Sequence, residues 1–432
     1  MLELNVFSEI GPLREVLVHE PGLEVDNMPP SLMEQLLFDD IIHGPKAREE
    51  HRRFRAVLEA LGARVHDVGD LLEEAIEAAP GRASELVDET YELEEIIDRK
   101  TAAELGGMAP ADLARALVQG LAARPEDFEP DYLFRLVPLP NLLFTRDAQV
   151  TLGKGTVISA MSRPARQREP LLARFVVENH PRLKSNPVHV DFLHRPSRRA
   201  ARHHVTPTLE GGDVMVFHEG VVLVGTSERT MERAVDLLVD KLRELADFHT
   251  LILVPIPQTR SAMHLDTIFT RISRNECLVY GPMILPGSPE TLSVVRIDLR
   301  QPDDWGRRRP NLLDALEGVG VELEPVCCGG TQDYIRQTRE QWTDGANSFA
   351  VSPGVILLYA RNLATAEELA RRGYDIVAVD DMNFAPDGRC LHVFTPGRKY
   401  VILLQGVELS RARGGPRCMT MPLVREDVRE DV

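Results

Sequence analysis

The sequence predicts an α/β fold in which one ββαβ unit occurs five times around a ring, with a helical insertion. Three observations carry this prediction. Pairs of short apolar segments that meet at a glycine turn recur along the chain, each followed by an amphipathic stretch and another apolar segment. The two ends of the chain complement each other, and pairing them closes the ring and removes exposed strand edges. Residues 69–130 lack the pattern altogether.

The first unit is divided between the two ends of the chain. Residues 15–22 predict a strand, residues 47–62 an amphipathic helix, and residues 63–68 a second strand. We expect its partner strands from the other end, where the apolar segments are HVFTP, KYVILLQ and CMTMPLV. Residues 1–68 are therefore assigned to the first part of the ring.

Residues 69–130 predict an all-helical insertion domain. They are rich in Ala, Leu and Glu, with helix stops at Pro80-Gly81, Gly106-Gly107 and Pro125. They hold 16 acidic and 5 basic side chains, a net charge of −11 out of the chain's −17. Most of the global charge therefore lies in this insertion and says little about a functional site.

The other four units follow within residues 131–432, which form the remainder of the ring and carry the catalytic residues. The clearest is 213–256, with the hairpin DVMVFHEGVVLVG, a long amphipathic stretch and the exit strand HTLILVPI. The others begin at Asp147, Asp266 and near Asn347. An arginine-rich segment, residues 195–204, interrupts this part and reads as a solvated surface loop of undefined role.

Composition limits the classes of function. The 432 residues are 43% hydrophobic and 27% charged, as in a folded globular chain. The net charge of −17 argues against nucleic acid or anionic membrane as the main partner and is compatible with a cationic substrate. Apolar residues 346–360 contain Pro353 and are shorter than the ~20 residues of a membrane span.

The cysteine pattern indicates a reducing compartment. Five cysteines are present, an odd number, and none forms a C-x-x-C pair. This argues against a disulfide framework and against a structural zinc site. The N-terminal residues carry charges every few positions, so they have no apolar core for a signal peptide. We therefore expect a cytoplasmic location, and both a homodimer and a homotetramer are compatible with the sequence.

Polar clusters stand where predicted strands meet loops, which is where functional sites collect. The segment PNLLFTRDAQV carries Asn141 and Asp147, although turn and capping chemistry is the favoured explanation when the segment is taken alone. The segment LEGGDV places Glu210 and Asp213 on a bend, where two glycines allow close backbone approach or a positive φ. Paired carboxylates bind a cation or act as acid and base.

The segment MHLDTIF reads as a strand. His264 and Asp266 then point to the same side, because side chains alternate along a strand. This suits a histidine acid/base beside a carboxylate. Two metal ligands are the alternative, but no third ligand with matching spacing is visible, so we predict no metal.

A cysteine with unusual neighbours lies near the end of the chain. In SRARGGPRCMTMPLV, Arg411, Arg413 and Arg417 crowd Cys418 after a Gly-Gly-Pro bend. Nearby cations lower the pKa of a thiol and favour the nucleophilic thiolate. The other four cysteines fit the simpler interpretation of small buried apolar residues.

Together these clusters supply a thiol nucleophile, a histidine and several carboxylates. A carboxylate-rich pocket binds a cation, and a thiolate attacks an electron-poor carbon. A guanidinium group satisfies both conditions, because carboxylates bind its N–H groups in a bidentate fork around the central carbon. A guanidine-modifying enzyme is the hypothesis that the residues themselves favour.

The chain resembles the arginine deiminase family, of the guanidine-modifying superfamily, over nearly its whole length. The resemblance implies a five-bladed, pseudo-symmetric ββαβ propeller (pentein-like) with an all-helical insertion domain, and hydrolysis of L-arginine to L-citrulline and ammonia without a cofactor. The segments that carry it are SEIGPLREVLVHEPG, LLFDDI, FTRD, PARQRE, LEGGD, MHLDT, WTDGANS and RGGPRCMTMPL.

The resemblance also implies roles for individual residues. Cys418 would be the nucleophile, forming a covalent amidino-thioether, and His264 the general acid and later base. The implied bidentate guanidinium ligands are Asp147 and Asp266, with Glu210 beside them. The implied substrate-binding residues are Asn141 and Phe144 in the pocket wall, Arg166 and Arg229 on the α-carboxylate, Arg413 on a mobile gating loop, and Asp213 behind the bend.

Alternatives remain open within and outside this superfamily. Agmatine or another guanidine would be the substrate of a sibling hydrolase, although agmatine has no carboxylate for Arg166 and Arg229 to bind. An amidinotransferase would need an amine acceptor that outcompetes water. A catalytically inactive arginine-binding protein is the alternative from another class.

Overall fold

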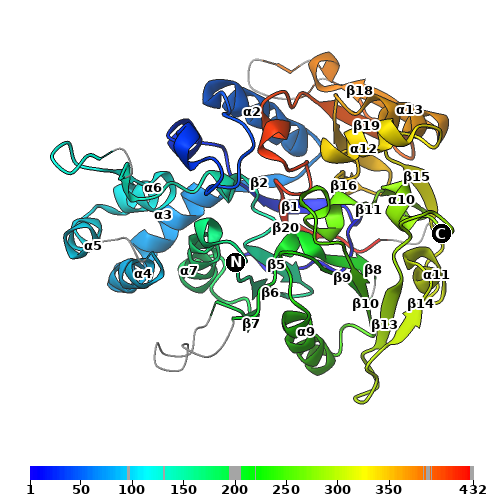
Figure 1. Ribbon diagram of the computed structural model, residues 1–432, viewed down its shortest axis with the longest axis horizontal. Helices are drawn as coiled ribbons and strands as arrows, with labels where there is room; N and C mark the ends of the chain where they lie inside the picture. Colours follow the sequence, from blue (N-terminus) through cyan, green and yellow to red (C-terminus); the bar gives the residue numbers. More distant parts are fainter. Residues whose placement is uncertain are drawn as a thin grey trace.

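The structure, a computed structural model, describes residues 1–94, 98–129, 132–193, 206–218, 220–382, 384–385, 390 and 392–428. The arginine-rich segment 195–204 lies outside the described residues. The fold is mixed α/β (Figure 1). None of the helices in the described ranges is long and apolar enough to cross a membrane.

The strands of the described residues form five sheets of three to five strands and one two-stranded ribbon. The larger sheets are, in spatial order, β2 (Arg64–Asp67)–β1 (Leu13–Val18)–β20 (Met421–Arg425); β5 (Gln149–Leu152)–β6 (Gly155–Ile158)–β7 (Val188–Asp191); β14 (Arg307–Arg309)–β13 (Val294–Asp298)–β10 (Thr250–Pro255)–β9 (Val221–Thr226)–β8 (Val214–His218); β11 (Phe269–Arg271)–β12 (Glu276–Val279)–β15 (Glu324–Cys327); and β16 (Phe349–Ser352)–β17 (Val355–Tyr359)–β19 (Lys399–Leu404)–β18 (Tyr374–Ala378).

All five larger sheets share one arrangement of strands. An antiparallel pair is followed by a parallel partner, as in β8–β9–β10, where Val216 pairs with Val222 and Leu223 with Ile252. The crossover to the parallel partner contains a helix, and these helices are α2 (Gly44–Ala60), α7 (Arg168–Asn179), α9 (Glu232–Leu245), α11 (Leu312–Glu317) and α13 (Leu363–Arg371). A parallel pair needs such a crossover, because a tight turn cannot connect its strands.

The chain ends meet in one sheet, as expected, but only CMTMPLV of the three expected segments supplies a strand to it, and HVFTP forms no strand. β1 pairs with β20 in antiparallel fashion, Val16 opposite Pro422. The segment KYVILLQ does not join them. It forms β19, which lies between β17 and β18 with Val401 opposite both Ile356 and Ile376. The expectation that KYVILLQ pairs with the first strand was wrong, because a local sequence pattern predicts a strand but not the sheet that the strand joins.

Burial follows the periodicity of the sequence. In α9 the buried side chains are Ala234, Val235, Leu238, Val239 and Leu242, which lie on one helical face. Strands β5, β6 and β9 are buried on both faces and are accordingly apolar or small at most positions. Helices therefore cover the sheets from outside. In Figure 1, α2, α9, α11 and α13 lie toward the periphery, α7 lies between the sheets and the helices on the left, and β1, β5, β8, β11 and β16 lie nearer the middle.

Four helices follow β2 without an intervening strand. They are α3 (Val68–Ala78), α4 (Pro80–Leu93), α5 (Arg99–Gly106) and α6 (Pro110–Gln119), and they lie on the left in Figure 1. Their apolar side chains share one core with α7, in which Leu72, Leu117 and Leu172 are buried. Segment 69–130 is not purely helical, because β3 (Leu121–Ala122) pairs with β4 (Phe134–Leu136).

Short turns precede the first strand of several sheets. The 3-10 turns η2 (Pro140–Leu143), η4 (Gly211–Asp213), η6 (Leu265–Thr267) and η8 (Leu409–Ala412) come before β5, β8, β11 and β20, and α12 (Tyr334–Trp342) comes before β16. The polar clusters predicted from sequence all fall in the turns, at the inner ends of the sheets.

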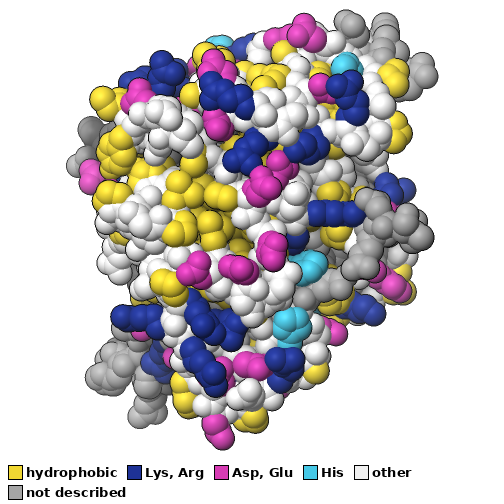
Figure 2. Space-filling view, turned by 90° about the vertical axis from the view of Figure 1, so that its right-hand side faces the viewer, with side chains coloured by type: hydrophobic (Ala, Val, Ile, Leu, Met, Phe, Trp, Pro, Cys, Tyr) yellow, Lys and Arg dark blue, Asp and Glu magenta, His cyan; other side chains and the backbone are white. Residues whose placement is uncertain are grey.

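On the face that lies to the right in Figure 1, acidic and basic side chains are interspersed around apolar ones (Figure 2).

Candidate active site

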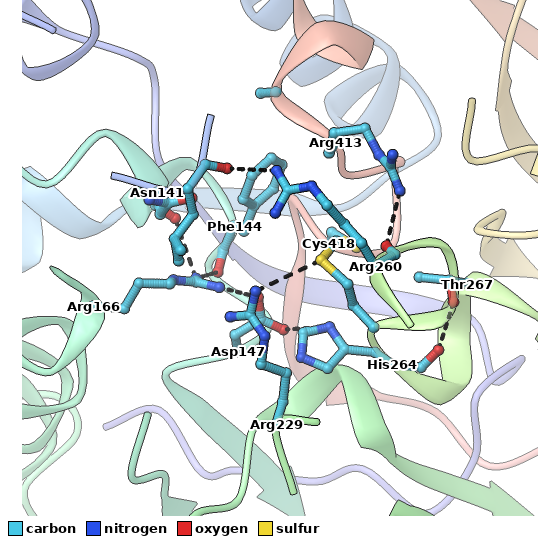
Figure 3. A pocket seen from close by; sticks show the side chains of 13 residues that line it. Asn141, Phe144, Asp147, Arg166, Arg229, Arg260, His264, Thr267, Arg413 and Cys418 are labelled. Atoms are coloured by element: carbon cyan, nitrogen blue, oxygen red, sulfur yellow. Dashed lines mark hydrogen bonds and ion pairs between the residues drawn. The ribbon is translucent and has the colours of Figure 1, made fainter. Parts of the chain in front are cut away.

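The turns before β5, β11 and β20 line a small pocket, together with Leu37, Arg166 and Arg229 (Figure 3). Its cavity volume is about 30 Å³, the space of about two water molecules. It is lined by Leu37, Asn141, Phe144, Asp147, Arg166, Arg229, Arg260, Met263, His264, Thr267, Ala412, Arg413 and Cys418. Eight residues singled out in the sequence are among them. Glu210 and Asp266 are not, but they contact the lining residues His264 and Cys418, and Asp213 binds the backbone of Leu265, next to His264.

Cys418 lies at the bottom of the pocket and is 5% exposed. Its Sγ accepts a hydrogen bond from Asn347 Nδ2 at 3.1 Å and lies 3.8 Å from Asp266 Oδ2. The Oδ1 atom of Asn347 accepts the backbone N–H groups of Arg417 and Cys418. Asn347 therefore fixes both the backbone and the sulfur, a function that its place in a loop motif did not reveal.

The thiol of Cys418 is protonated in this environment. Burial raises its pKa well above the ordinary value, and the carboxylates of Asp266 and Asp147 raise it further. The expected lowering by three arginines was wrong, because each is engaged elsewhere. Arg411 pairs with Asp40 and Glu408, Arg417 pairs with Glu9 and Asp266, and Arg413 stacks on Trp342.

His264 joins the pocket to two carboxylates. Its Nε2 lies 2.9 Å from Glu210 Oε2 and its Nδ1 lies 3.8 Å from Asp147 Oδ1. Burial by itself lowers the pKa of His264, but Asp147 and Glu210 outweigh burial and raise it to about 9. The imidazole is therefore a charged proton donor at neutral pH.

His264 and Asp266 do not lie in a strand, contrary to expectation. His264 caps η6, Asp266 lies within it, and β11 begins only at Phe269. In a 3-10 turn the side-chain direction repeats every third residue rather than every second. Both side chains nevertheless contact the site, His264 through the pocket wall and Asp266 through Cys418.

Asp147, Glu210 and His264 form the one group of three potential metal ligands within the described ranges, with ligand atoms inside 4.8 Å of one another. A metal needs a neutral imidazole, because the imidazolium has no free lone pair. With the pKa of His264 raised to about 9, this group is better suited to holding a proton than an ion.

The two aspartates predicted as guanidinium ligands are both buried but differ in their partners. Asp147 Oδ2 accepts from Arg166 Nη1 at 2.8 Å, and its Oδ1 accepts from the backbone N–H of Gly212. Asp266 Oδ2 accepts from Arg417 Nη1 at 2.8 Å, whereas its buried Oδ1 has no hydrogen-bond partner. The carboxylate that contacts Cys418 through Oδ2 therefore keeps Oδ1 as an open acceptor for an N–H group.

Arg166 and Arg229 also line the pocket from the two sides of Asp147 (Figure 3). Arg166 donates to Glu169 through Nε and Nη2 as well as to Asp147. Arg229 donates through Nε to Glu228, and its Nη1 lies 3.6 Å from Glu210. Carboxylates thus hold both guanidinium groups at the pocket.

The glycines of LEGGD act through close approach rather than through positive φ. A Cβ atom on Gly212 would lie 2.6 Å from His264 Nδ1, and one on Gly211 would lie 2.0 Å from the Arg146 carbonyl oxygen. Asp213, just behind, accepts from the Leu265 N–H and from the Ser227 hydroxyl. It ties the bend to the turn that carries His264.

Residues at the pocket mouth were mostly missed from the sequence. Leu37 adopts a φ of 67°, and Asn141 donates through Nδ2 to the neighbouring Leu36 carbonyl. Arg260, which also lines the pocket, donates to Asp39 and to the Leu37 carbonyl. These are ordinary loop residues in the sequence, and only the fold brings them together.

Comparisons with known proteins agree with this geometry. The profile of the arginine deiminase family matches residues 34–425. An arginine deiminase from Borrelia recurrentis is 33% identical over 443 residues, and one from Clostridium perfringens is 34% identical over 450 residues; each alignment covers 98% of both chains. A solved amidinotransferase from Microseira wollei, of the saxitoxin biosynthetic pathway, covers 99% of both chains with a TM-score of 0.53 at 12% identity. That last likeness concerns the fold alone.

Proposed function

The chain belongs to the arginine deiminase family, and on that premise we propose that it hydrolyses L-arginine to L-citrulline and ammonia through a covalent intermediate on Cys418. One observation supports this most directly. The buried thiol of Cys418 lies 3.8 Å from Oδ2 of Asp266, whose Oδ1 has no hydrogen-bond partner, at a pocket that also holds Asp147 and a protonated His264.

We propose that the substrate guanidinium binds between Asp147 and Asp266. The open Oδ1 atom of Asp266 accepts one N–H group. At Asp147 the substrate takes the place of Arg166 Nη1, which is then free for the α-carboxylate. Arg229 binds the same carboxylate from the opposite wall. Its Nη2 has only a weak contact to Met263 sulfur at 3.6 Å and is available for this purpose.

Binding of the cation prepares the nucleophile. In the empty pocket Asp266 and Asp147 raise the pKa of Cys418. A guanidinium between the carboxylates offsets their charge, so the thiol loses its proton to solvent as the substrate enters. The thiolate then forms a bond to the guanidinium carbon and gives a neutral tetrahedral adduct, while the surrounding carboxylates stabilise the cations that precede and follow it.

His264 moves the protons in both halves of the reaction. As an imidazolium it donates a proton to the departing amino group, so that ammonia leaves and an S-alkyl thiouronium cation remains on Cys418. The neutral imidazole then takes a proton from water, and the hydroxide adds to the same carbon. When the C–S bond breaks, the carbonyl of citrulline forms, the hydroxyl proton goes to solvent and the thiolate is restored.

The experiment compares L-arginine with agmatine, which lacks the α-carboxylate. We expect equal amounts of citrulline and ammonia from arginine and no product from agmatine. Cys418→Ser should abolish ammonia release while arginine binding remains detectable by calorimetry. Cys327→Ser, at a buried thiol outside the pocket, is the control and should keep activity. Product from agmatine, or activity in Cys418→Ser, would contradict the proposal.

We also propose the architecture behind this site. The five larger sheets, each an antiparallel pair with a parallel partner, support a five-bladed propeller with domain parts 1–68 and 131–432. Helices α3–α6 support a mainly helical insertion between them. The free thiols of all five cysteines support a reducing, cytoplasmic location.

A further inference from the structure

We infer that Trp342 is a positioning residue, whose indole face holds the guanidinium of Arg413 in the place where it closes the mouth of the pocket. The Arg413 guanidinium carbon lies 3.3 Å from the centroid of the Trp342 ring. A cation over an aromatic face is attracted by the ring quadrupole, and more strongly where water is excluded. Arg413 is 9% exposed, so its charge is largely desolvated.

The other contacts of Arg413 are few. Its Nη2 donates to the Arg260 carbonyl at 3.2 Å, while its Nε and Nη1 atoms are buried without a hydrogen-bond partner. Burial lowers the pKa of Arg413, against the opposing effect of the Asp344 carboxylate. The indole face is therefore a principal partner of this side chain, together with one hydrogen bond.

The pocket must widen before an amino acid can enter it, because its cavity volume is only about 30 Å³. Arg413 is the wall residue best placed to move. It is a long side chain in a left-handed backbone conformation (φ 66°) at the end of η8, and among the described residues no carboxylate pairs with it directly. Asp147, Arg166 and His264, in contrast, are held by several buried ionic contacts. The contact of Arg413 with the Trp342 ring thus sets the fraction of time for which the mouth of the pocket is open.

Trp342 is suited to this role by its position. It is the last residue of α12 and is 42% exposed, so one edge of the ring meets solvent while its face covers Arg413. The same loop continues to Asn347, which holds Cys418. The segment 342–347 therefore connects the mouth of the pocket to its bottom.

The test measures alkylation of Cys418 by iodoacetamide at pH 8 in the absence of arginine, with the modified residue located by mass spectrometry. Trp342→Leu keeps an apolar side chain without a ring, and we expect alkylation to be about tenfold faster, as for loss of a partly desolvated cation–π contact. Trp342→Phe should give an intermediate rate. Trp305→Phe, at an indole that is 79% exposed and outside the pocket, is the matched control and should change nothing.

A double-mutant comparison separates positioning from a general structural effect. Arg413→Ala should accelerate alkylation as much as Trp342→Leu, and the double variant should show no further increase. In the Trp305→Phe background the remaining indole should change its fluorescence when Arg413 becomes Ala. An unchanged rate in Trp342→Leu, or additive rates in the double variant, would overturn the inference.

The inference rests on the proposed function for the identity of the site, but the experiment needs no turnover. If the wild-type protein released no citrulline from arginine, the proposed function would fail while the alkylation rates still tested the stack. If citrulline formed and the alkylation rates were all equal, the role of Trp342 alone would fail.

Discussion

Glu210→Gln should lower the pKa of His264 and shift the pH dependence of the reaction. Glu210 Oε2 lies 2.9 Å from His264 Nε2, and the substitution replaces a carboxylate by a neutral amide of the same shape. An opposite charge at this distance shifts a pKa by about 1 to 3 units, or about 1.4 to 4 kcal/mol. Because Asp147 also raises the pKa and remains in place, we expect a decrease of about 2 units.

The decrease has a consequence at alkaline pH. With a pKa of about 9, His264 in the wild-type protein is about 90% protonated at pH 8. With a pKa near 7 it would be about 10% protonated, so proton donation to the leaving group falls about tenfold. The alkaline limb of the kcat profile should therefore move to lower pH by the same ~2 units.

Two measurements check this prediction. The pH profile of kcat reports the group in the substrate complex, and an NMR titration of the 13 histidines reports the free protein, with His264→Gln to assign the signal. Glu228→Gln is the control, since Glu228 pairs with Arg229 and Arg163 and does not contact His264. If the histidine signal and the alkaline limb both stay in place in Glu210→Gln, the electrostatic reasoning about this site is wrong.

Two other predictions concern backbone space and buried charge. Gly212→Ala should lower kcat at least 100-fold in the citrulline assay without unfolding the protein, because its Cβ would lie 2.6 Å from His264 Nδ1. The control is Gly81→Ala, which should retain full activity because no atom lies within 4 Å of the new Cβ. His19→Gln should lower the free energy of unfolding by about 3 kcal/mol in urea titrations, since it leaves the buried carboxylate of Glu24 without its cation. The pKa of His19 is raised from 6.5 to about 10. The difference in unfolding free energy between wild type and variant should therefore be full below pH 6.5 and disappear as the pH rises through 10. A difference that does not change with pH would exclude the charge of His19 as its cause.

The sequence alone was sufficient for the repeated unit and for many of the polar groups of the site. Hairpins and amphipathic helices leave periodic patterns, and turn residues such as Asn141, Glu210 and Cys418 stand out against apolar strands. The pairing partner of each strand was harder to predict. β19 enters the sheet between β17 and β18 although other segments separate it from both, and no local pattern encodes that choice.

Electrostatics was the least predictable part of the site. The sequence shows that arginines surround Cys418 but not that Glu9, more than 400 residues away, binds one of them. Once Arg417 is occupied by Glu9 and Asp266, its charge no longer activates the thiol. The mouth residues Leu37 and Arg260 are invisible for a related reason, since their importance lies in which loop they meet and not in their residue type.

The pairing of β1 with β20 has a consequence for how the protein is made. Val16 finds its antiparallel partner in Pro422, and Arg417 finds Glu9, only after the ribosome has synthesised the whole intervening chain. Until then the first strand has an open edge on that side and the nucleophile does not yet exist. Contacts of such long sequence separation close slowly, because the loop entropy is lost before the contact forms. The thiol therefore joins its site among the last events of synthesis, and a nascent chain that stops early carries the carboxylates of the pocket without the sulfur.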